Sequence, residues 1–337
     1  MRVFQIEGGW SIDHLRLAAR PEPEPGPGQV VVRMKASALN YRDLVVPSRG
    51  YGRHTGTLPL IPVSDGVGEV TAVGPGVRRV APGDRVCPTF FQHWTSGEPD
   101  PERLAGSLGG PLDGTMSELM CLSEEGVVKV PAHLTDLEAA TLPCAALTAW
   151  SALTACSGTR PGDRVLVQGC GGVALFALTF AKLLGAHVTV ISSSDERIER
   201  VMKLGADAAV NYRAVPEWAK ATREFTAGRG YDLIVELGGE RTLPQSLRCV
   251  RHGGTVAMIG VLSGGTLAAS IGQIVTRQLR LQGVTVGHRD GFEAMLRAVG
   301  QHRVRPVVDR VFPFADLKDA LAYLRSGVQF GKVCIAH

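Results

Sequence analysis

The sequence predicts an α/β protein that combines a doubly wound parallel sheet with a β-rich region. From residue 163 to about residue 266, apolar runs of strand length alternate with helical patterns at regular spacing. This alternation is typical of a parallel sheet with helices on both faces. The first 122 residues show shorter strand patterns broken by Pro and Gly instead. A chain of 337 residues is long enough for two domains.

The β-rich region is divided by turn and loop signals. Pro and Gly dominate 21–28, which predicts a rigid surface loop. Residues 88–113 have no regular period, and a long loop of this kind is typical of a lid over a substrate. Strands are expected at 29–36, at 66–73, after the turn at 81–86, at 115–122 and at 126–130.

The central region opens with a helix start. Thr135 and Glu138 have the spacing of a capping box. Beyond residue 266 we expect one more helix, a strand at 280–286 and a final helix–strand pair. Between these segments, strands are expected at 164–168, 187–191, 231–236 and 255–260, with helices near 173–184, 195–204, 216–226 and 241–250.

A glycine turn follows the first of these strands. The apolar run that ends at Gln168 meets a Gly-x-Gly-x-x-Ala pattern, and a helical pattern follows at once. Gly169 permits a sharp turn, Gly171 lets the backbone approach a pyrophosphate, and Ala174 allows close helix–sheet packing. The helix N-terminus then attracts phosphates. An ordinary strand–helix turn is the alternative, but the context predicts a Rossmann-type dinucleotide site formed by Gly169, Gly171, Gly172, Val173 and Ala174.

The end of the next strand indicates which nicotinamide cofactor is bound. Proteins that prefer NAD usually place an acid about twenty residues after the turn, and Ser192 stands there instead. A hydroxyl tolerates a 2′-phosphate, and Arg197 can neutralise part of its charge. Ser193 with Glu196 also fits a simple capping box, and Asp195 or Glu196 is an alternative ribose contact. We therefore expect NADPH rather than NADH, held here by Ser192, Ser193, Ser194 and Arg197.

Composition excludes several classes of function. The net charge of +4 comes from 36 basic and 32 acidic residues spread along the chain, so neither nucleic acid nor membrane binding is expected. The N-terminus lacks the apolar core of a signal peptide. Seven widely spaced cysteines without a Cys-x-x-Cys pair suit the reducing cytoplasm. A small-molecule substrate is the expected partner.

Four further segments combine with the glycine turn into a recognisable set. They are Ala38-Leu39-Asn40-Tyr41-Arg42-Asp43, Pro59-Leu60-Ile61-Pro62-Val63-Ser64-Asp65-Gly66, Leu142-Pro143-Cys144-Ala145-Ala146-Leu147-Thr148-Ala149-Trp150 and Phe330-Gly331-Lys332-Val333. Together they resemble the medium-chain dehydrogenase/reductase superfamily over essentially the whole chain, most of all its zinc-free quinone oxidoreductase and enoyl reductase branch. The resemblance implies a GroES-like catalytic domain formed by 1–122 and 267–337, a Rossmann domain at 123–266, and a cleft between them.

The resemblance also implies a site without metal. Relatives that use zinc bind it with a Cys, a His-Glu pair and a second Cys. Here Asn40 and Ser64-Asp65 take the first places, and only Cys144 still matches. Catalytic Zn²⁺ normally needs three protein ligands of Cys, His or Glu type, and an amide and a hydroxyl cannot serve. We therefore expect no zinc and an acceptor that takes hydride readily, such as a quinone or a carbonyl-activated alkene.

Three neighbouring residues are the candidate catalytic groups. Tyr41 is expected to donate a proton or polarise an oxygen, because a phenol stays protonated at neutral pH; packing in the core is the alternative. By resemblance, Asn40 orients the nicotinamide ribose or the substrate oxygen. Asp43 is a second polar wall, with a turn cap or an ion pair to Arg42 as alternatives. The expected pocket aromatics, which could equally anchor the 88–113 loop, are Phe90, Phe91 and Trp94.

The resemblance assigns further cofactor contacts. Thr148 would touch the nicotinamide, and Tyr212 and Lys332 would face phosphates, with a solvated lysine as the alternative for Lys332. The strand at 280–286 resembles the edge strand through which family members pair, so a homodimer is expected, which also covers the strand edge. Main-chain contacts to the carboxamide would come from Ile259, Gly260, Val261, Val284, Thr285 and Val286.

The sequence therefore predicts a zinc-free, NADPH-dependent oxidoreductase that transfers hydride to an enone, an enal or a quinone. One alternative is a metal-independent alcohol or carbonyl dehydrogenase. The other is a non-catalytic NADPH-binding sensor or scaffold, which gains weight because no strong acid/base constellation surrounds Asn40 and Tyr41.

Overall fold

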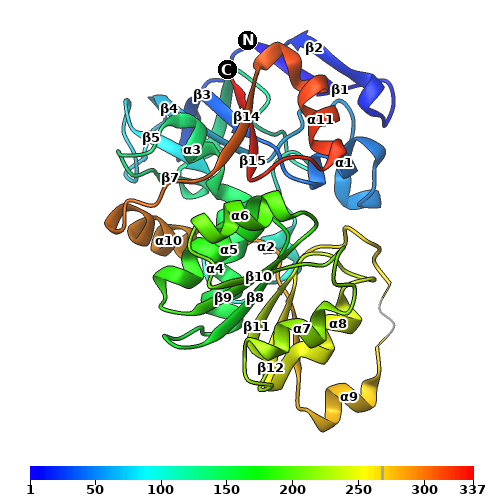
Figure 1. Cartoon of the computed structure of the whole chain (residues 1–337). Helices are drawn as coiled ribbons and strands as arrows, with labels where there is room; N and C mark the ends of the chain where they lie inside the picture. The colour runs from blue at the N-terminus through cyan, green and yellow to red at the C-terminus, as the bar shows by residue number, and fades with distance from the viewer. Residues whose placement is uncertain (267–268) are drawn as a thin grey trace. The chain divides into compact units, whose positions relative to one another are not determined.

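The computed structural model describes residues 1–266 and 269–337. The chain forms two compact units, one made of Met1–Leu147 with Val286–His337 and the other of Thr148–Thr285. We call them the terminal unit and the central unit. The blue and red ends of the chain share the terminal unit, whereas green and yellow segments build the central unit (Figure 1).

The central unit is built on a six-stranded sheet in the order β10-β9-β8-β11-β12-β13. Every neighbouring pair in this sheet is parallel. The strand order reverses between β8 and β11, and doubly wound sheets bind their ligands at such a reversal. The strands are β8 (Arg164–Gln168), β9 (His187–Ser192), β10 (Ala208–Asn211), β11 (Tyr231–Glu236), β12 (Val250–Met258) and β13 (Arg280–Gly283).

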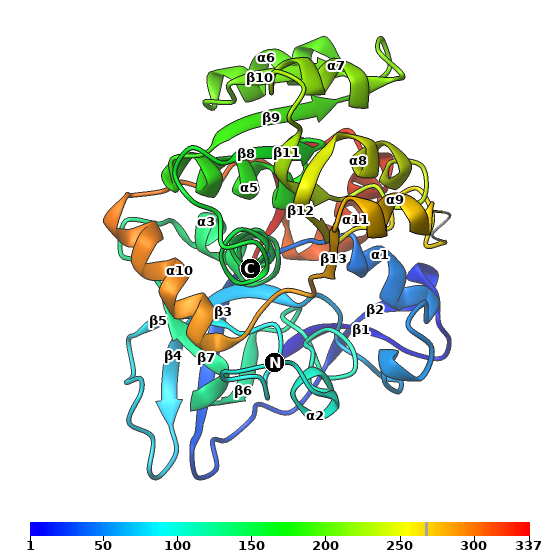
Figure 2. The same cartoon turned by 90° about the horizontal axis from the view of Figure 1, so that it is seen from below.

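Helices cover both faces of this sheet, as right-handed crossovers require. Figure 2 shows α5 and α8 on opposite sides of the strands. Side chains of α7 and α8 such as Trp218 and Leu247 pack with Ile234 and Val256 of the sheet into one buried cluster. The helices are α4 (Leu147–Ser151), α5 (Gly172–Leu183), α6 (Asp195–Lys203), α7 (Trp218–Glu224), α8 (Leu243–Cys249) and α9 (Ile271–Thr276), with η6 (Ala152–Cys156) after α4.

The terminal unit joins the two ends of the chain in one sheet of order β14-β15-β3-β4-β5-β7, with β6 also paired to β3. The C-terminal strand β15 runs antiparallel to β3, so the returning chain is fixed by backbone hydrogen bonds. A separate hairpin pairs β1 with β2. The strands are β1 (Arg2–Ile6), β2 (Leu15–Ala19), β3 (Gln29–Ala38), β4 (Asp65–Val73), β5 (Arg85–Pro88), β6 (Leu119–Ser123), β7 (Val127–Lys129), β14 (Val308–Pro313) and β15 (Lys332–Ala336).

The core of the terminal unit mixes early and late residues. Ile6 and Leu39 are buried in one cluster with Leu321 and Ile335, so neither end of the chain forms this core alone. The helical elements are η1 (Ile12–His14), α1 (Arg42–Val45), η2 (Val46–Ser48), η3 (Gly52–Thr55), α2 (Pro101–Leu104), η4 (Glu124–Gly126), α3 (Asp136–Ala140), η5 (Leu142–Ala146), α10 (Arg289–Gln301), η7 (Phe314–Asp316) and α11 (Leu317–Ser326).

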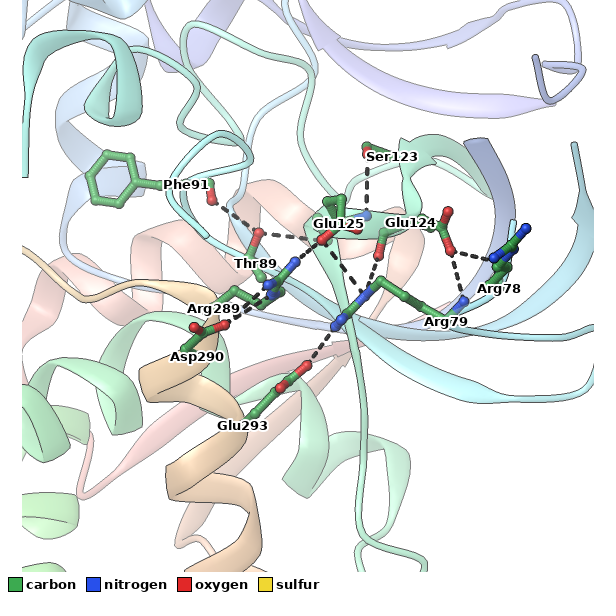
Figure 3. Close-up of polar contacts among 11 residues, drawn as sticks. Arg78, Arg79, Thr89, Phe91, Ser123, Glu124, Glu125, Arg289, Asp290 and Glu293 are labelled. Atoms are coloured by element: carbon green, nitrogen blue, oxygen red, sulfur yellow. Dashed lines mark hydrogen bonds and ion pairs between the residues drawn. The ribbon is translucent and has the colours of Figure 1, made fainter. Parts of the chain in front are cut away.

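Ion pairs fasten α10 to the N-terminal part of the terminal unit. Arg79 Nη2 lies 2.5 Å from a carboxylate oxygen of Glu293, and Arg289 forms an ion pair with Glu125 (Figure 3). We call these four residues the α10 clasp. The backbone N–H of Arg289 also donates to the carbonyl of Trp94 at 3.0 Å. The start of α10 is therefore tied both to η4 and to the 88–113 loop.

Most of the expected elements are confirmed, including the α/β class and the parallel sheet. The capping box of Thr135 with Glu138 is present. The expected capping box at Ser193 is wrong, because Ser194 is the N-cap of α6. Strands β10 and β14 were not expected, and β13 ends earlier than predicted.

The compact units divide after Leu147 and after Thr285, later than the domain boundaries expected at 122/123 and 266/267; the second of these lies outside the described residues. Among the helices of the described ranges, none combines the length and the apolar character that a membrane span requires.

Candidate functional site

The glycine turn has the geometry of a phosphate cradle. Gly169 has a φ of +79°, which only glycine adopts without strain. A Cβ added to Gly169 or Gly171 would point into open space. Gly171 is the N-cap of α5, and within the described residues no side chain caps that end. Backbone N–H groups and the helix dipole therefore face space that suits an anion, so the residues present fit a dinucleotide.

At the carboxyl end of β9, Ser192 does not have the exposed hydroxyl that the sequence analysis expected to face the 2′ position of the cofactor. Ser192 is only 1% exposed, and the thiol of Cys170 donates to its hydroxyl at 3.2 Å. Its hydroxyl is therefore used inside the protein. Ser193 and Arg197 are only half-buried, and Nη1 of Arg197 donates to the Ser193 hydroxyl at 3.5 Å. The expected contact to the 2′ position shifts from Ser192 to these residues.

An acid near this strand end is already engaged within the protein. Asp195 accepts a hydrogen bond from Nδ2 of Asn211 at 2.9 Å. Tyr212, the next residue, is 39% exposed, and its N–H donates to the carbonyl of Ser192 at 2.9 Å. The backbone of Tyr212 thus lies beside the end of β9, and the adenosine-phosphate contact expected of its side chain stays a prediction.

Most of the remaining predicted cofactor residues directly follow β12 or β13 in the chain, whereas Thr148 belongs to α4. A Cβ on Gly260 would lie 2.1 Å from the carbonyl oxygen of Leu237, which explains the glycine. Val284 donates from its N–H to Met258 at 3.0 Å. The other members of this set range from buried to exposed: Thr148 at 3% and Val286 at 6% are buried, Ile259 is half-buried, and Thr285 and Val261 are exposed.

In the terminal unit, strand pairing brings the predicted catalytic segment next to the end of the chain. The register of β15 on β3 sets Cys334 opposite Ala38, which places Lys332 opposite Asn40. The pairing of β4 with β3 sets Asp65 opposite the same Ala38. Residues far apart in the sequence therefore meet where β3 ends. We call Asn40, Asp43, Asp65, Cys144 and Lys332 the polar cluster.

Lys332 is the buried cation of this cluster. It is 3% exposed. Its Nζ donates to Oδ1 of Asn40 and to the carbonyl of Leu39, both at 2.6 Å, and lies 4.0 Å from Oδ2 of Asp65. Both sequence interpretations, a solvated lysine and a phosphate contact, are corrected, because the ammonium points into the unit and is held there.

Asp65 is fully buried beside that cation. Its Oδ2 accepts the N–H of Cys144 at 3.0 Å, and its Oδ1 accepts the hydroxyl of Ser64 at 2.7 Å. Burial raises the pKa of Asp65, although the charge of Lys332 and these hydrogen bonds oppose the rise. Burial likewise raises the pKa of the Cys144 thiol, so this cysteine stays protonated at neutral pH.

Asp43 is the second buried acid, at 1% exposure. Its Oδ2 accepts the backbone N–H of Asn40 at 2.7 Å, so Asp43 caps the turn before α1. Burial raises the pKa of Asp43 to about 6, more than the neighbouring Arg42 lowers it. The guanidinium of Arg42 donates to the carbonyls of Leu108 and Gly110 instead. The alternative of a turn cap is therefore the one the structure contains.

Two atoms of the cluster are buried with unmade hydrogen bonds among the described residues: Nδ2 of Asn40 and Oδ1 of Asp43. The Asn40 side chain favours the ionised form of Asp65, so the amide lies close to that carboxylate. An unmade bond of a buried polar group costs about 1–3 kcal/mol. Such groups in a native protein call for a functional explanation.

Backbone strain adjoins the cluster. Val63, directly before Ser64, has a φ of +73° and is 1% exposed. A β-branched residue in this region is a genuine outlier, and such strain concentrates at functional sites. The carbonyl of Val63 accepts the N–H of Thr115 at 2.7 Å, which helps to hold the strained conformation. Residue types alone gave no signal of this conformation.

Two tyrosines lie at the surface beside the cluster. Tyr41 is 49% exposed, which excludes the alternative of a core residue and leaves its hydroxyl available. Tyr51 is 46% exposed, and its pKa is raised by partial burial and by the charge of Asp43 against that of Arg42. Sequence reasoning missed Tyr51, because its segment carries no motif and approaches the cluster only through the fold.

The expected pocket aromatics anchor the 88–113 loop instead. Phe90, Phe91 and Trp94 are 6–7% exposed. Their rings contact each other edge to face, with centroids 4.7 and 5.8 Å apart, and Trp94 packs on His288 at 5.7 Å. The guanidinium of Arg42 lies 4.7 Å over Phe90. The prediction that they line an open pocket is corrected.

Groups of the polar cluster that could hold a metal are already engaged with one another. Oδ1 of Asn40 already accepts from the Lys332 ammonium, and the hydroxyl of Ser64 donates to Asp65. A divalent cation beside Asp65 would face the buried ammonium of Lys332, which lies 4.0 Å from that carboxylate. No group of three or more His, Cys, Asp or Glu suited to a metal occurs within residues 1–266 and 269–337.

Comparison with known proteins places both units in one family. A model described as the alcohol dehydrogenase GroES-like domain matches residues 26–132, and one described as zinc-binding dehydrogenase matches 172–301. A zinc-type alcohol dehydrogenase-like protein of Schizosaccharomyces pombe is 42% identical over 92% of this chain and 91% of its own length. The crystal structure of a putative alcohol dehydrogenase from Sinorhizobium meliloti is 42% identical, with a TM-score of 0.94 over 100% of this chain and 98% of that one.

Reductases occur among the more distant relatives. The acryloyl-coenzyme A reductase of Metallosphaera sedula is 27% identical over 93% of this chain and 94% of its own length. The crystal structure of a 2-haloacrylate reductase is 26% identical, with a TM-score of 0.81 over 100% of this chain and 99% of that chain. The chain therefore belongs to the medium-chain dehydrogenase/reductase superfamily, among its zinc-type alcohol dehydrogenase-like members, and is a pyridine nucleotide-dependent oxidoreductase.

Proposed function

We propose that the protein is a zinc-free, NADPH-preferring reductase that transfers hydride to an alkene activated by a neighbouring carbonyl, or to a quinone. The observation that carries the proposal is the polar cluster, in which Lys332 and Asn40 take up the place and the donors that a catalytic metal would need. Without a Lewis acid, oxidation of a simple alcohol is hard, whereas an electron-poor alkene or a quinone accepts hydride more readily.

The preference for NADPH is supported by charge at the end of β9. Arg197 and Arg200 both act electrostatically on Cys170 of the glycine turn, so two guanidinium groups lie within reach of that turn. Of the two acids at the start of α6, Asp195 is hydrogen-bonded to Asn211, whereas Glu196 is exposed. The two guanidinium groups favour a 2′-phosphate over a 2′-hydroxyl.

When bound, the reduced nicotinamide supplies the hydride. The β-carbon of the alkene gains this hydride, the π-electron pair moves to the carbonyl oxygen, and the α-carbon then takes one proton from water or a phenol. The Nδ2–H of Asn40, which has no hydrogen-bond partner among the described residues, is suited to stabilise the substrate's carbonyl oxygen while that oxygen is negatively charged. The exposed phenol of Tyr41 is suited to deliver the proton, with Tyr51 as the neighbouring alternative.

Two of the named relatives support this class of substrate. The acryloyl-coenzyme A reductase and the 2-haloacrylate reductase carry names that describe reduction of an alkene conjugated to a carbonyl. Their likeness to this chain extends over both units.

A four-acceptor assay tests the proposal. Purified protein is mixed with NADPH or NADH and an enone, a quinone or an aldehyde, and with NADP⁺ and an alcohol in reverse. We expect turnover of the enone or quinone, a lower KM for NADPH than for NADH, and unchanged activity after treatment with a zinc chelator. Activity confined to the alcohol–aldehyde pair, or lost with stoichiometric zinc, contradicts the proposal.

The names of the most similar proteins favour a second candidate, a metal-independent alcohol or carbonyl dehydrogenase. In that case the Asn40 amide and a tyrosine would have to polarise the carbonyl oxygen together. The same assay separates the candidates, because only the first reduces a carbon–carbon double bond.

We also propose that the protein forms a homodimer through β13. This strand is the edge of the central sheet, and Arg280, Gln282 and Gly283 are exposed there. An unpaired edge offers its N–H and C=O groups to a second copy. The N–H of Val284 points to β12, so that of Gly283 faces the free edge. Gly283→Pro removes this edge donor, so light scattering should report a dimer for the wild type and a monomer for the variant. A wild-type monomer contradicts this.

A further inference from the structure

The contact between Lys332 and Asn40 fixes the orientation of an amide. An ammonium group has three donors and no acceptor. The side-chain atom of Asn40 that lies 2.6 Å from Nζ must therefore be the oxygen. The amide nitrogen is on the opposite branch of the side chain, facing away from the ammonium. The orientation follows from hydrogen-bond chemistry and does not depend on telling nitrogen from oxygen by position alone.

The same contact changes the strength of the amide as a donor. A hydrogen bond from a cation to the carbonyl oxygen draws electron density towards that oxygen and makes the N–H groups more acidic. Lys332 is 3% exposed and Asp65 is fully buried, so water screens this effect little. Hydrogen bonds that involve a charged group are about twice as strong as neutral ones.

The polarised N–H groups are not used up by the protein. Nδ2 of Asn40 carries two hydrogens, and it forms no hydrogen bond within the described residues. Asp65, the acid close to the Asn40 side chain, can accept at most one of these hydrogens in a rearranged state, because the two diverge from the nitrogen. At least one strengthened donor is thus left without a partner among the described residues.

We propose that Lys332 is a positioning residue that orients and polarises Asn40, so that the Nδ2–H of Asn40 binds the substrate oxygen on which negative charge develops. The inference rests on the proposed function, in which that oxygen belongs to the carbonyl conjugated to the alkene or to the quinone. Lys332 itself does not touch substrate; it replaces the electrostatic role of a metal through one intervening amide.

The role of Asp65 follows from the same geometry. Burying the ammonium of Lys332 alone would be costly. Oδ2 of Asp65, 4.0 Å from Nζ of Lys332, supplies the compensating charge. The hydrogen bonds from Ser64 and from the N–H of Cys144 hold that carboxylate in place. Asp65 therefore stabilises the charged state of Lys332 without competing for the Asn40 oxygen.

A double-mutant cycle tests the inference. Lys332→Met keeps the length of the side chain and removes the charge, and Asn40→Ala removes the donor. We expect kcat for enone or quinone reduction to fall about 100-fold in Asn40→Ala, in the range seen when one such donor is removed, and about 10-fold in Lys332→Met. In the double variant, Lys332→Met should add less than a twofold loss, because its effect passes through Asn40.

Two further measurements separate polarisation from a structural role. The Kd for NADPH, measured by fluorescence, should change less than twofold in each variant. Across enones with increasingly electron-withdrawing substituents, log kcat should depend more steeply on the substituent in Lys332→Met than in the wild type, since a weaker donor leaves more charge on the substrate. Lys129→Met, which removes an ion-paired but 56% exposed lysine of the same unit, is the matched control and should leave both values unchanged.

The outcomes are distinct. If the wild type reduces neither enones nor quinones, the proposed function is refuted. If the wild type is active and Lys332→Met costs the same factor with and without Asn40, or leaves the substituent dependence unchanged, the inference alone is refuted. Should Lys332→Met fail to fold because Asp65 is left unpaired, Asn40→Ala is measured instead in the Asp65→Asn/Lys332→Met background, where no charge is buried alone. There it should cost less than about 20-fold in kcat, against about 100-fold in the wild type.

Discussion

The glycine turn of the central unit and the polar cluster of the terminal unit recognise ligands in opposite ways. The turn uses the backbone of one continuous segment, Gly169 to Ala174, and its chemistry needs the absence of side chains. The cluster uses side chains from separate segments that only the fold brings together. Local sequence is thus sufficient for the first site, whereas the second depends on tertiary structure.

The energetics of the two sites differ accordingly. At the turn, glycine accepts a positive φ at no steric cost, and the N–H groups of α5 stay in contact with open space. In the cluster, Lys332, Asp65 and Asp43 are all at most 3% exposed. Desolvation of such charges is expensive, and removing one partner of a buried pair typically costs about 3–5 kcal/mol. The cluster is therefore stable only as a set.

The largest expected effect is at the turn. Gly169→Val puts a β-branched residue at a φ of +79° and a side chain where the pyrophosphate would lie. Loss of about two hydrogen bonds to charged oxygens, each worth about 1.5–3 kcal/mol, should weaken NADPH binding about 1000-fold. Calorimetry measures the Kd.

Gly158→Val is the matched control for that variant. Gly158 has a φ of +62°, also faces open space and belongs to the same unit, but lies outside the turn. Both variants should lose similar stability, whereas only Gly169→Val should lose NADPH. Equal affinities in the two variants would remove the turn from the cofactor site.

The second prediction concerns the cost of the cluster. The pKa of Asp43 is about 6 in the folded protein against 3.8 unfolded, so the folded state holds its proton to higher pH. Ionisation of Asp43 therefore lowers the free energy of unfolding of the protein as the pH rises from about 4 to about 6, by about 3 kcal/mol in all. Asp43→Asn is always neutral, so it should be more stable than the wild type at pH 8, by up to that amount, and equal to it at pH 4.

Urea denaturation at the two pH values measures the difference. Asp84→Asn serves as a control of opposite sign, because a hydrogen bond from Lys129 lowers the pKa of Asp84. That replacement should lose stability at neutral pH. If Asp43→Asn gains nothing at pH 8, then Arg42 and Lys332 compensate the buried carboxylate fully.

The contrast between the sites also explains what sequence reasoning achieved. The parallel sheet, the Gly169 turn and the Thr135 capping box follow from local patterns, and the structure contains all three. Lys332 was misinterpreted because its burial is decided by the pairing of β15 with β3, from opposite ends of the chain. Nothing in the residues around position 332 encodes that partner.

Other misinterpretations have the same cause. Ser192 has the right residue type at the right spacing, but its side chain turns towards Cys170 inside the unit. Phe90 and Trp94 suit a pocket or a core equally well, and their packing against Arg42 and His288 decides for the core. For these residues the sequence identified the segment, but the direction of the side chain depends on tertiary packing and could not be predicted from it.

The third prediction sharpens the comparison at the edge of the turn. Arg197→Ala should weaken NADPH binding about 10-fold and NADH binding less than twofold, because only NADPH carries the 2′-phosphate that an arginine binds. Ser192→Ala should change neither affinity, since its hydroxyl is buried. Lys203→Ala, at the far end of α6, is the charge control. An equal loss for both cofactors in Arg197→Ala would assign that residue to the shared part of the dinucleotide.

The smallest effect is expected at the α10 clasp, which is ionic like the polar cluster but partly solvated. The side chains of Arg79 and Glu293 are 29% and 37% exposed, and ion pairs of this exposure typically contribute about 0.2–1 kcal/mol. Glu293→Gln should therefore lower Tm by only about 1–4 °C at low salt, and the difference should vanish near 1 M NaCl. Arg297→Gln, an exposed charge on the same helix, is the control and should leave Tm unchanged. A larger fall in Tm that persists at high salt would mean that the α10 clasp behaves as a desolvated network. The difference in burial would then not explain how the clasp and the polar cluster differ in energetics.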